Sequence, residues 1–92
     1  MQITFDPVKR EATLRDRGLD FAEAAAVFEG RTIEGPDERF DYGETRIITV
    51  GYLRGRMVVV VWTQRGEARH IISMRKANDR EKARFGQRLG EG

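Results

Sequence analysis

The most constraining feature of the sequence is an unbroken run of four valines at residues 58–61. β-branched side chains pack well on a pleated sheet, and a run without polar interruption is typical of a strand covered on both faces. We therefore expect the valine strand to lie at the centre of a sheet. Gly66, shortly after the run, suits the positive φ of a tight turn, and a second strand is predicted through residues 70–74.

Period-two geometry assigns the side chains of this second strand to opposite faces. The alternation predicts these two sets: His70, Ile72 and Met74 on one face, and Arg69, Ile71, Ser73 and Arg75 on the other. Basic and hydroxyl groups would then alternate with apolar groups along a rigid strand, which is able to hold a functional site.

Helix starts are marked by local capping signals. Asp6 directly before Pro7 predicts a helix N-terminus, and Gly18 suits the left-handed residue that ends that helix. Asp20 and Asn78 each precede a glutamate at capping-box spacing, which predicts two further helices. The apolar stripe of the last helix is short, so we expect that helix to be loosely docked or to complete its contacts on another chain.

Strand signals complete the order of elements. Residues 2–5 and 32–34 read as short strands, residues 35–37 as a turn, and residues 45–53 as a strand that a turn at 54–55 joins to the valine strand. The order is strand, two helices, antiparallel sheet and helix, which predicts an α+β fold. A length of 92 residues favours one domain spanning residues 1–92.

Composition excludes several classes of protein. The chain has no cysteine and one histidine, which argues against a disulfide framework and a metal centre. No apolar run approaches the roughly 20 residues of a membrane span, and no signal peptide is evident. We expect a soluble, cytoplasmic protein without cofactor, metal or membrane contact.

Charge is distributed unevenly along the chain. Residues 29–44 carry six acidic and two basic side chains, whereas residues 65–88 carry eight basic and three acidic ones. A basic C-terminal third is typical of a surface that meets phosphates or an acidic protein. A solvated charged surface without a partner is the alternative, and for a charge run alone it is the better explanation.

Several segments, taken together and in order, resemble the BrnT toxins. They are Phe5–Lys9, Gly18–Phe21, Arg46–Gly51, Val58–Thr63, Arg65–Glu67 and Ile71–Ala77. The resemblance implies a RelE/ParE-like fold with the N-terminal strand and two helices packed on an antiparallel sheet, and a C-terminal helix. It also implies the toxin half of a type II toxin–antitoxin pair, a ribonuclease that halts translation. Neutralisation by a BrnA-type antitoxin is implied too, with operator DNA met only through that antitoxin.

The chain departs from the family pattern at three positions. Thr13 replaces a usual asparagine, Arg17 replaces the histidine of Lys-His-Gly, and His70 replaces a usual arginine. A cation and a histidine have thus exchanged places. If the family histidine moves a proton, activity would be weakened; if it only contacts phosphate, Arg17 can substitute for it.

Metal-independent cleavage of RNA requires proton transfer and stabilisation of phosphate charge. His70 is the only side chain whose ordinary pKa suits proton transfer near neutrality, although a core or edge histidine bonded to the backbone is an equal alternative. Arg75, Arg65 and Lys76 are candidates for holding phosphate, and Glu67 for a base or for orienting an arginine.

Further residues are candidates for contact with RNA. The predicted catalytic set is His70, Arg75, Arg65 and Glu67, and the predicted RNA-binding set is Arg17, Arg69, Ser73 and Lys76. Trp62, Tyr52 and Phe40 could stack on bases, but core packing explains Trp62 better.

Two other functions remain open at this point. The fold could act without catalysis by seizing a protein target, as ParE-like toxins do. Alternatively, the chain could be a degenerate toxin that binds its antitoxin but is silenced by the changes at Thr13 and Arg17.

Overall fold

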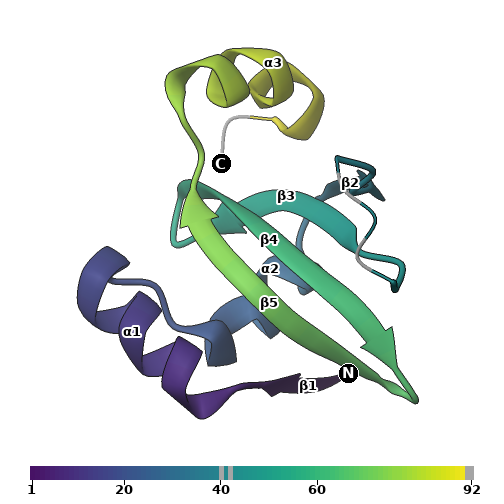
Figure 1. Cartoon of the computed structure of the whole chain (residues 1–92). Coiled ribbons are helices and arrows are strands. Elements are labelled where there is room, and N and C mark those ends of the chain that lie inside the picture. The colour runs from purple at the N-terminus through teal and green to yellow at the C-terminus, as the bar shows by residue number, and fades with distance from the viewer. Residues whose placement is uncertain (40, 42, 91–92) are drawn as a thin grey trace.

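The computed structural model describes residues 1–39, 41 and 43–90, which form a five-stranded sheet with helices (Figure 1). The elements are β1 (Gln2–Phe5), α1 (Pro7–Arg17), a 3₁₀ turn η1 (Phe21–Glu23), α2 (Ala24–Glu29), β2 (Ile33–Pro36), β3 (Ile47–Leu53), β4 (Arg56–Arg65), β5 (Ala68–Lys76) and α3 (Asp79–Leu89). The strand order β1-β5-β4-β3-β2 puts the valine strand β4 at the centre, as predicted. The α+β class is confirmed.

The sheet is mixed because β1 runs parallel to β5, whereas β2, β3, β4 and β5 pair antiparallel. β1 pairs only with the first half of β5, and its last partner is Ile71 opposite Phe5. The turn predicted at residues 35–37 is wrong in part, because Gly35 and Pro36 end strand β2 and pair with β3.

One face of the sheet is covered by α1, η1 and α2 (Figure 1). The first hydrophobic cluster lies there, with Phe21 and Val27 packed against Val58 and Val60 of β4. Gly51 on β3 permits the close approach of α2, since a Cβ atom at this position would lie 2.9 Å from Cγ1 of Val27.

The helix caps follow the sequence signals with one exception. The Asp6 side chain accepts a hydrogen bond from the Val8 amide at 2.9 Å, and Gly18 ends α1 with φ of 70°. The capping box predicted after Asp20 is wrong, because the carboxylate of Glu23 accepts hydrogen bonds from Arg54. The chain there forms a 3₁₀ turn before α2.

α3 covers part of the other face of the sheet, and its start has the predicted capping box between Asn78 and Glu81. Phe85 and Leu89 pack with Met57 and Val59 in a second hydrophobic cluster. Leu89 is only 4% exposed. α3 therefore docks on its own sheet through these two apolar side chains, while the other residues of the helix are half-buried or exposed, and loose docking stays a prediction.

The faces predicted for β5 are right up to Ile71 and wrong beyond it, because a β-bulge interrupts the alternation. Ser73 pairs with Val61 while Ile71 pairs with Trp62, so Ile72 is an extra residue with no partner on β4. The bulge lets Ile71 and Met74, three residues apart, both enter the first cluster. No helix in the described part of the chain is long and apolar enough to cross a membrane.

Candidate functional site

Two adjoining pockets form a groove along β5, which we call the α1–β5 groove. The pocket between α1 and β5 has a volume of about 250 Å³ and is lined by Lys9, Ala12, Thr13, Asp16, Arg17, Phe21, Ile72 and Ser73. The next pocket has a volume of about 350 Å³ and is lined by Asp6, Lys9, Glu44, Arg46, Arg65, His70, Ile71 and Ile72. Lys9 and Ile72 line both pockets, so the two form one continuous depression.

The groove exists because β1 ends early and β5 bulges. β1 has its last partner at Ile71, so the rest of β5 is an edge beside α1. Ile72, the extra residue of the bulge, is half-buried and turns into the groove instead of the core. Bulges next to active sites commonly redirect a side chain in this way.

His70 lies in the second pocket with a defined hydrogen-bond partner. Its Nδ1 is 2.9 Å from Oγ1 of Thr4, the residue that pairs with it across the parallel β1–β5 ladder. Burial lowers the pKa of His70 below its ordinary value, and the charges of Arg65 and Lys9 lower it further against the opposing effect of Glu44. The imidazole is therefore mostly neutral at neutral pH. It is half-buried in a pocket, and the hydrogen-bond partner of its ring is a threonine hydroxyl and not the backbone.

Three cations and two carboxylates line the pocket of the imidazole. Oε1 of Glu44 lies 3.7 Å from Nε of Arg46 and Oε2 lies 3.8 Å from Nη2 of Arg65, so the carboxylate bridges the two guanidinium groups. Lys9 reaches the same pocket from the first turns of α1. The pocket thus combines a neutral histidine with concentrated positive charge, which suits a phosphate group.

Sequence reasoning did not assign to the site four polar residues that line this pocket, Asp6, Lys9, Glu44 and Arg46, nor Thr4, which binds the imidazole. The position of Glu44 could have been found from the predicted hairpin. The register that pairs Leu53 with Arg56 across the turn also pairs Ile47 with Trp62. The same register, continued beyond the strand, places residue 44 opposite Arg65. The Thr63 hydroxyl donates a hydrogen bond to the Thr45 carbonyl at 2.7 Å and holds this extension.

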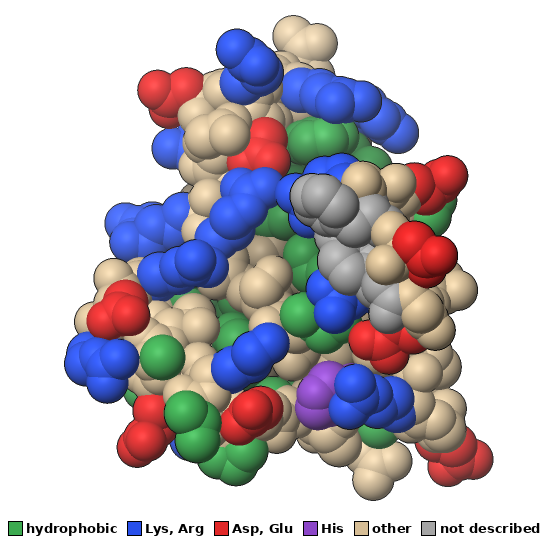
Figure 2. Space-filling model, in the orientation of Figure 1, with side chains coloured by type: hydrophobic (Ala, Val, Ile, Leu, Met, Phe, Trp, Pro, Cys, Tyr) green, Lys and Arg blue, Asp and Glu red, His purple; other side chains and the backbone are tan. Residues whose placement is uncertain are grey.

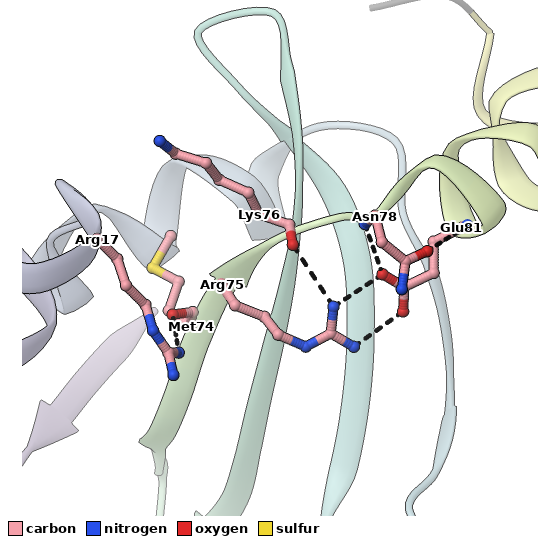
Figure 3. A network of polar contacts seen from close by, with 6 residues as sticks. All are labelled: Arg17, Met74, Arg75, Lys76, Asn78 and Glu81. Atoms are coloured by element: carbon pink, nitrogen blue, oxygen red, sulfur yellow. Dashed lines mark hydrogen bonds and ion pairs between the residues drawn. The ribbon is translucent and has the colours of Figure 1, made fainter.

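Arg17 and Ser73 line the first pocket of the groove, which adjoins the second pocket that contains His70. Nη1 of Arg17 donates a hydrogen bond to the Met74 carbonyl at 3.0 Å, across the uncovered edge of β5 (Figure 3). The structure therefore brings together His70, Arg65, Arg17 and Ser73 from the predicted set.

Arg75 lies on the same face of the sheet but is engaged by α3. Its two Nη atoms donate hydrogen bonds to the Glu81 carboxylate at 2.7 and 2.8 Å (Figure 3). This pairing raises the pKa of Arg75 and lowers the pKa of Glu81 to about 2. The Arg75 guanidinium lines neither pocket of the groove, so it fixes α3 to β5 in this structure.

Three other predicted residues lie away from the groove. The Arg69 guanidinium stacks on the rings of Phe28 and Trp62, 4.5 and 4.3 Å from their centroids, on the helix-covered face. Lys76 pairs with Val58 of the first cluster and points away from Arg75 (Figure 3). Glu67 is exposed on the β4–β5 turn.

The aromatic residues considered for stacking on bases are mostly committed to packing. Trp62 is 3% exposed, and its Nε1 donates a hydrogen bond to Oγ1 of Thr49 at 2.8 Å. Tyr52 packs against the second cluster. Phe40 lies outside the described residues.

Basic side chains gather on the face that carries the groove. Figure 2 shows Lys and Arg side chains over β5, the end of α1 and α3, with the single histidine among them. Within residues 1–39, 41 and 43–90, no three side chains of His, Asp or Glu converge as a group able to hold a metal ion.

A family model described as "Ribonuclease toxin, BrnT, of type II toxin-antitoxin system" matches residues 5–81. The chain belongs to the BrnT family. The matched residues include Arg17 and His70 of the groove. This BrnT protein is thus a ribonuclease toxin whose family pairs each toxin with an antitoxin. No curated protein matches the chain.

Proposed function

We propose that this BrnT protein is a metal-independent endoribonuclease that inhibits translation, with its active site in the α1–β5 groove at His70. The observation that carries this proposal is the neutral imidazole held by Thr4 in a pocket that also contains Arg65, Arg46 and Lys9. A neutral histidine can accept a proton, and the surrounding cations can stabilise the negative charge that develops on phosphate.

The proposed reaction is an intramolecular transesterification of RNA. The reaction uses the tautomer in which Nδ1–H donates to Oγ1 of Thr4, because Nε2 of His70 is then free to take the proton of a ribose 2′-hydroxyl. The 2′-oxygen then forms a bond to phosphorus, the bond from phosphorus to the 5′-oxygen breaks, and the 5′-oxygen takes a proton from solvent. The products are a 2′,3′-cyclic phosphate and a free 5′-hydroxyl, and no oxidant or reductant is needed.

Arg65 is assigned to the phosphate and Glu44 to holding Arg65 and Arg46 in place. Arg17 and Ser73 line the first pocket and are assigned to the neighbouring nucleotide. Glu67 and Lys76, on the turn and on the other side of the sheet edge, have no part in this scheme.

The partners follow from the family and remain part of the proposal. A BrnA-type antitoxin would neutralise the toxin and would itself carry any contact with operator DNA. We also propose a cytoplasmic location and kinship with the RelE/ParE-like fold, which the order of strand, helices, antiparallel strands and C-terminal helix supports.

The decisive experiment is cleavage of total bacterial RNA by the purified protein in EDTA, with His70→Ala and Arg65→Ala beside the wild type. We expect wild-type cleavage and a loss of about 10²-fold or more in each variant. Arg56→Ala is the control, because Arg56 is exposed at the start of β4 and lines a pocket with Gly18 and Leu19, away from the groove.

Other outcomes would redirect the assignment. Equal cleavage by wild type and folded His70→Ala would remove His70 from the reaction. Intact RNA with all proteins folded would favour ribosome-dependent cleavage, a non-catalytic toxin that seizes a protein target, or a degenerate toxin. Expression without antitoxin then separates these, since only a degenerate toxin is harmless to growth.

A further inference from the structure

α3 carries a row of arginines that the proposed active site does not use. Arg80, Arg84 and Arg88 are spaced four residues apart, so they lie along one side of the helix at intervals of about 6 Å. All three are exposed. We call these three residues the α3 arginine row.

The α3 arginine row differs from most other arginines of the molecule, because its charge is not neutralised by carboxylates of the described residues. Carboxylates lie within salt-bridge distance of many of the others: Arg10, Arg15, Arg39, Arg46, Arg54, Arg65 and Arg75. Within the described part of the chain, Arg80 and Arg88 form no ion pair, and Arg84 lies over the Phe85 ring at 5.1 Å. An unpaired row of guanidinium groups attracts anions.

The row is also held in a fixed orientation. One residue further along, Glu81, Phe85 and Leu89 form the inward side of the helix, where Glu81 binds Arg75 and the other two pack in the second cluster. The capping box at Asn78 fixes the first turn. The arginines therefore extend from a docked helix and not from a loose tail.

The chemistry of the row favours a phosphate backbone over a protein partner. Protein interfaces are centred on buried apolar or aromatic anchors surrounded by charge. The apolar side chains of α3, Phe85 and Leu89, are turned to the sheet and are not available as anchors. Exposed arginines are typical of contacts with phosphate oxygens.

The row lies on the molecule where RNA leaving the groove could reach it. Arg17 in the groove and Arg75 at the foot of α3 come from neighbouring elements, and Figure 3 shows both beside the end of β5. Figure 2 shows Lys and Arg side chains over β5 and α3 on one face. The charged surface is thus shared between the groove and the helix.

We propose that the α3 arginine row binds the phosphates of the substrate RNA at nucleotides beyond the scissile step, so that a long single strand is held by both the groove and α3. This inference rests on the proposed ribonuclease site and assigns its substrate as extended single-stranded RNA. The row supplies affinity but does not touch the reacting atoms.

The test uses matched double variants of the full chain. Arg80→Ala with Arg88→Ala removes two cations from the row, and Arg15→Ala with Arg56→Ala removes two exposed cations that lie outside the groove. Binding is measured by fluorescence anisotropy over a series of salt concentrations with a long poly(U) strand whose 2′-hydroxyls are methylated, so that it cannot undergo the proposed cleavage. Cleavage is measured with a long RNA and with a dinucleotide that spans only the scissile step.

We expect the row variant to bind poly(U) about tenfold more weakly, with the slope of log affinity against log salt reduced by about 1.4, the value for two lost contacts on a single strand. KM for the long RNA should rise, while cleavage of the dinucleotide is unchanged. The control variant should match the wild type in every assay.

Several results would overturn the proposal. One is unchanged poly(U) binding by the row variant, and another is an equal loss in the control variant, which would indicate a general charge effect. A third is retained poly(U) binding with lost binding to polyglutamate, which would assign the row to an acidic protein segment. An inactive wild type would contradict the proposed ribonuclease site. The α3 arginine row would still be tested, because the binding assay does not require cleavage.

Discussion

At the scale of single residues, the proposed reaction depends on one imidazole and its surroundings. His70 lies beside Arg65 and Lys9 and is partly buried, and these effects lower its pKa. The same pocket would be an ordinary basic surface if the histidine were charged. Protonation of His70 is therefore the chemical variable that distinguishes a catalytic pocket from a merely basic one.

The pH dependence of cleavage follows from this pKa. Because the pKa of His70 is lowered from 6.5, the neutral imidazole, which is the proposed base, is already the main form at pH 6.5. We expect kcat/KM to rise with pH and to reach half its plateau below 6.5. A rate that instead falls as pH rises would identify His70 as a general acid and contradict the proposed direction of proton transfer.

Thr4 is predicted to act only through His70. Thr4→Val keeps the shape of the side chain but removes the oxygen that lies 2.9 Å from Nδ1. Loss of one such hydrogen bond is worth about 1 kcal/mol, so we expect kcat to fall by up to about tenfold with little change in KM. If the pH profile shifts while thermal stability is unchanged, Thr4 acts by positioning the imidazole. An unchanged pH profile with lower thermal stability would mean that the role of Thr4 is purely structural.

At the scale of elements, α3 is held to the sheet by a polar and an apolar contact. The polar contact is the Arg75–Glu81 pair, which lowers the pKa of Glu81 from 4.5 to about 2. A carboxylate whose pKa is lowered by folding stabilises the fold above its unfolded pKa, and the contribution disappears as pH falls from about 4.5 toward 2.

Glu81→Gln should therefore lower the free energy of unfolding by about 1 kcal/mol near neutral pH, a modest value because Arg75 remains partly exposed. The difference from wild type should vanish in urea unfolding at acid pH. Asp79→Asn is the matched control, since that exposed carboxylate at the first position of α3 has only a 3.9 Å contact with Lys82. If the difference in the free energy of unfolding did not depend on pH, the amide would act by disturbing the packing and not by removing the charge of Glu81.

The contact between α2 and β3 sets a second prediction at this scale. Gly51→Ala would place a methyl group 2.9 Å from Cγ1 of the fully buried Val27, and overpacking of this kind costs about 1–3 kcal/mol. Gly35→Ala, in β2 with open space around it, should be close to neutral. Equal stability of the two variants in chemical unfolding would mean that α2 can shift away from the sheet without cost.

The elements show what the sequence could and could not predict. Capping residues and the valine run are local signals, and they correctly predicted α1, α3 and the central strand β4. The bulge at Ile72 was not predictable, because it depends on the pairing of β5 with β4 and the sequence around Ile72 contains no signal for it. Strict alternation consequently assigned Ser73 and Arg75 to the face of Arg69 instead of the face of His70, and it obscured the groove, both of whose pockets are lined by Ile72.

At the scale of the whole molecule, two hydrophobic clusters stabilise the two faces of one sheet. Leu89, near the end of the described chain, closes the second cluster over Val50, Met57 and Val59. The helix that carries the arginine row is therefore part of the folded core. Removal of α3 would confound loss of a binding surface with loss of stability.

Leu89→Ala measures this contribution directly. A buried leucine truncated to alanine costs about 2–5 kcal/mol, which is a large part of the stability of a domain this small. We expect a clear fall in the urea midpoint, whereas Gln87→Ala, an exposed position on the same helix, should leave it unchanged. A small effect of Leu89→Ala would indicate that α3 is only weakly coupled to the sheet.

The parallel pairing of β1 with β5 has a consequence for how the toxin is made. Thr4 and His70 are 66 residues apart in sequence, and their contact requires the first strand to join the last one. A chain emerging from the ribosome folds from its N-terminal side, and contacts of such separation form late. The proposed imidazole is thus oriented only after β5 has left the ribosome and paired with β1, so a nascent chain that still lacks β5 does not carry the finished pocket.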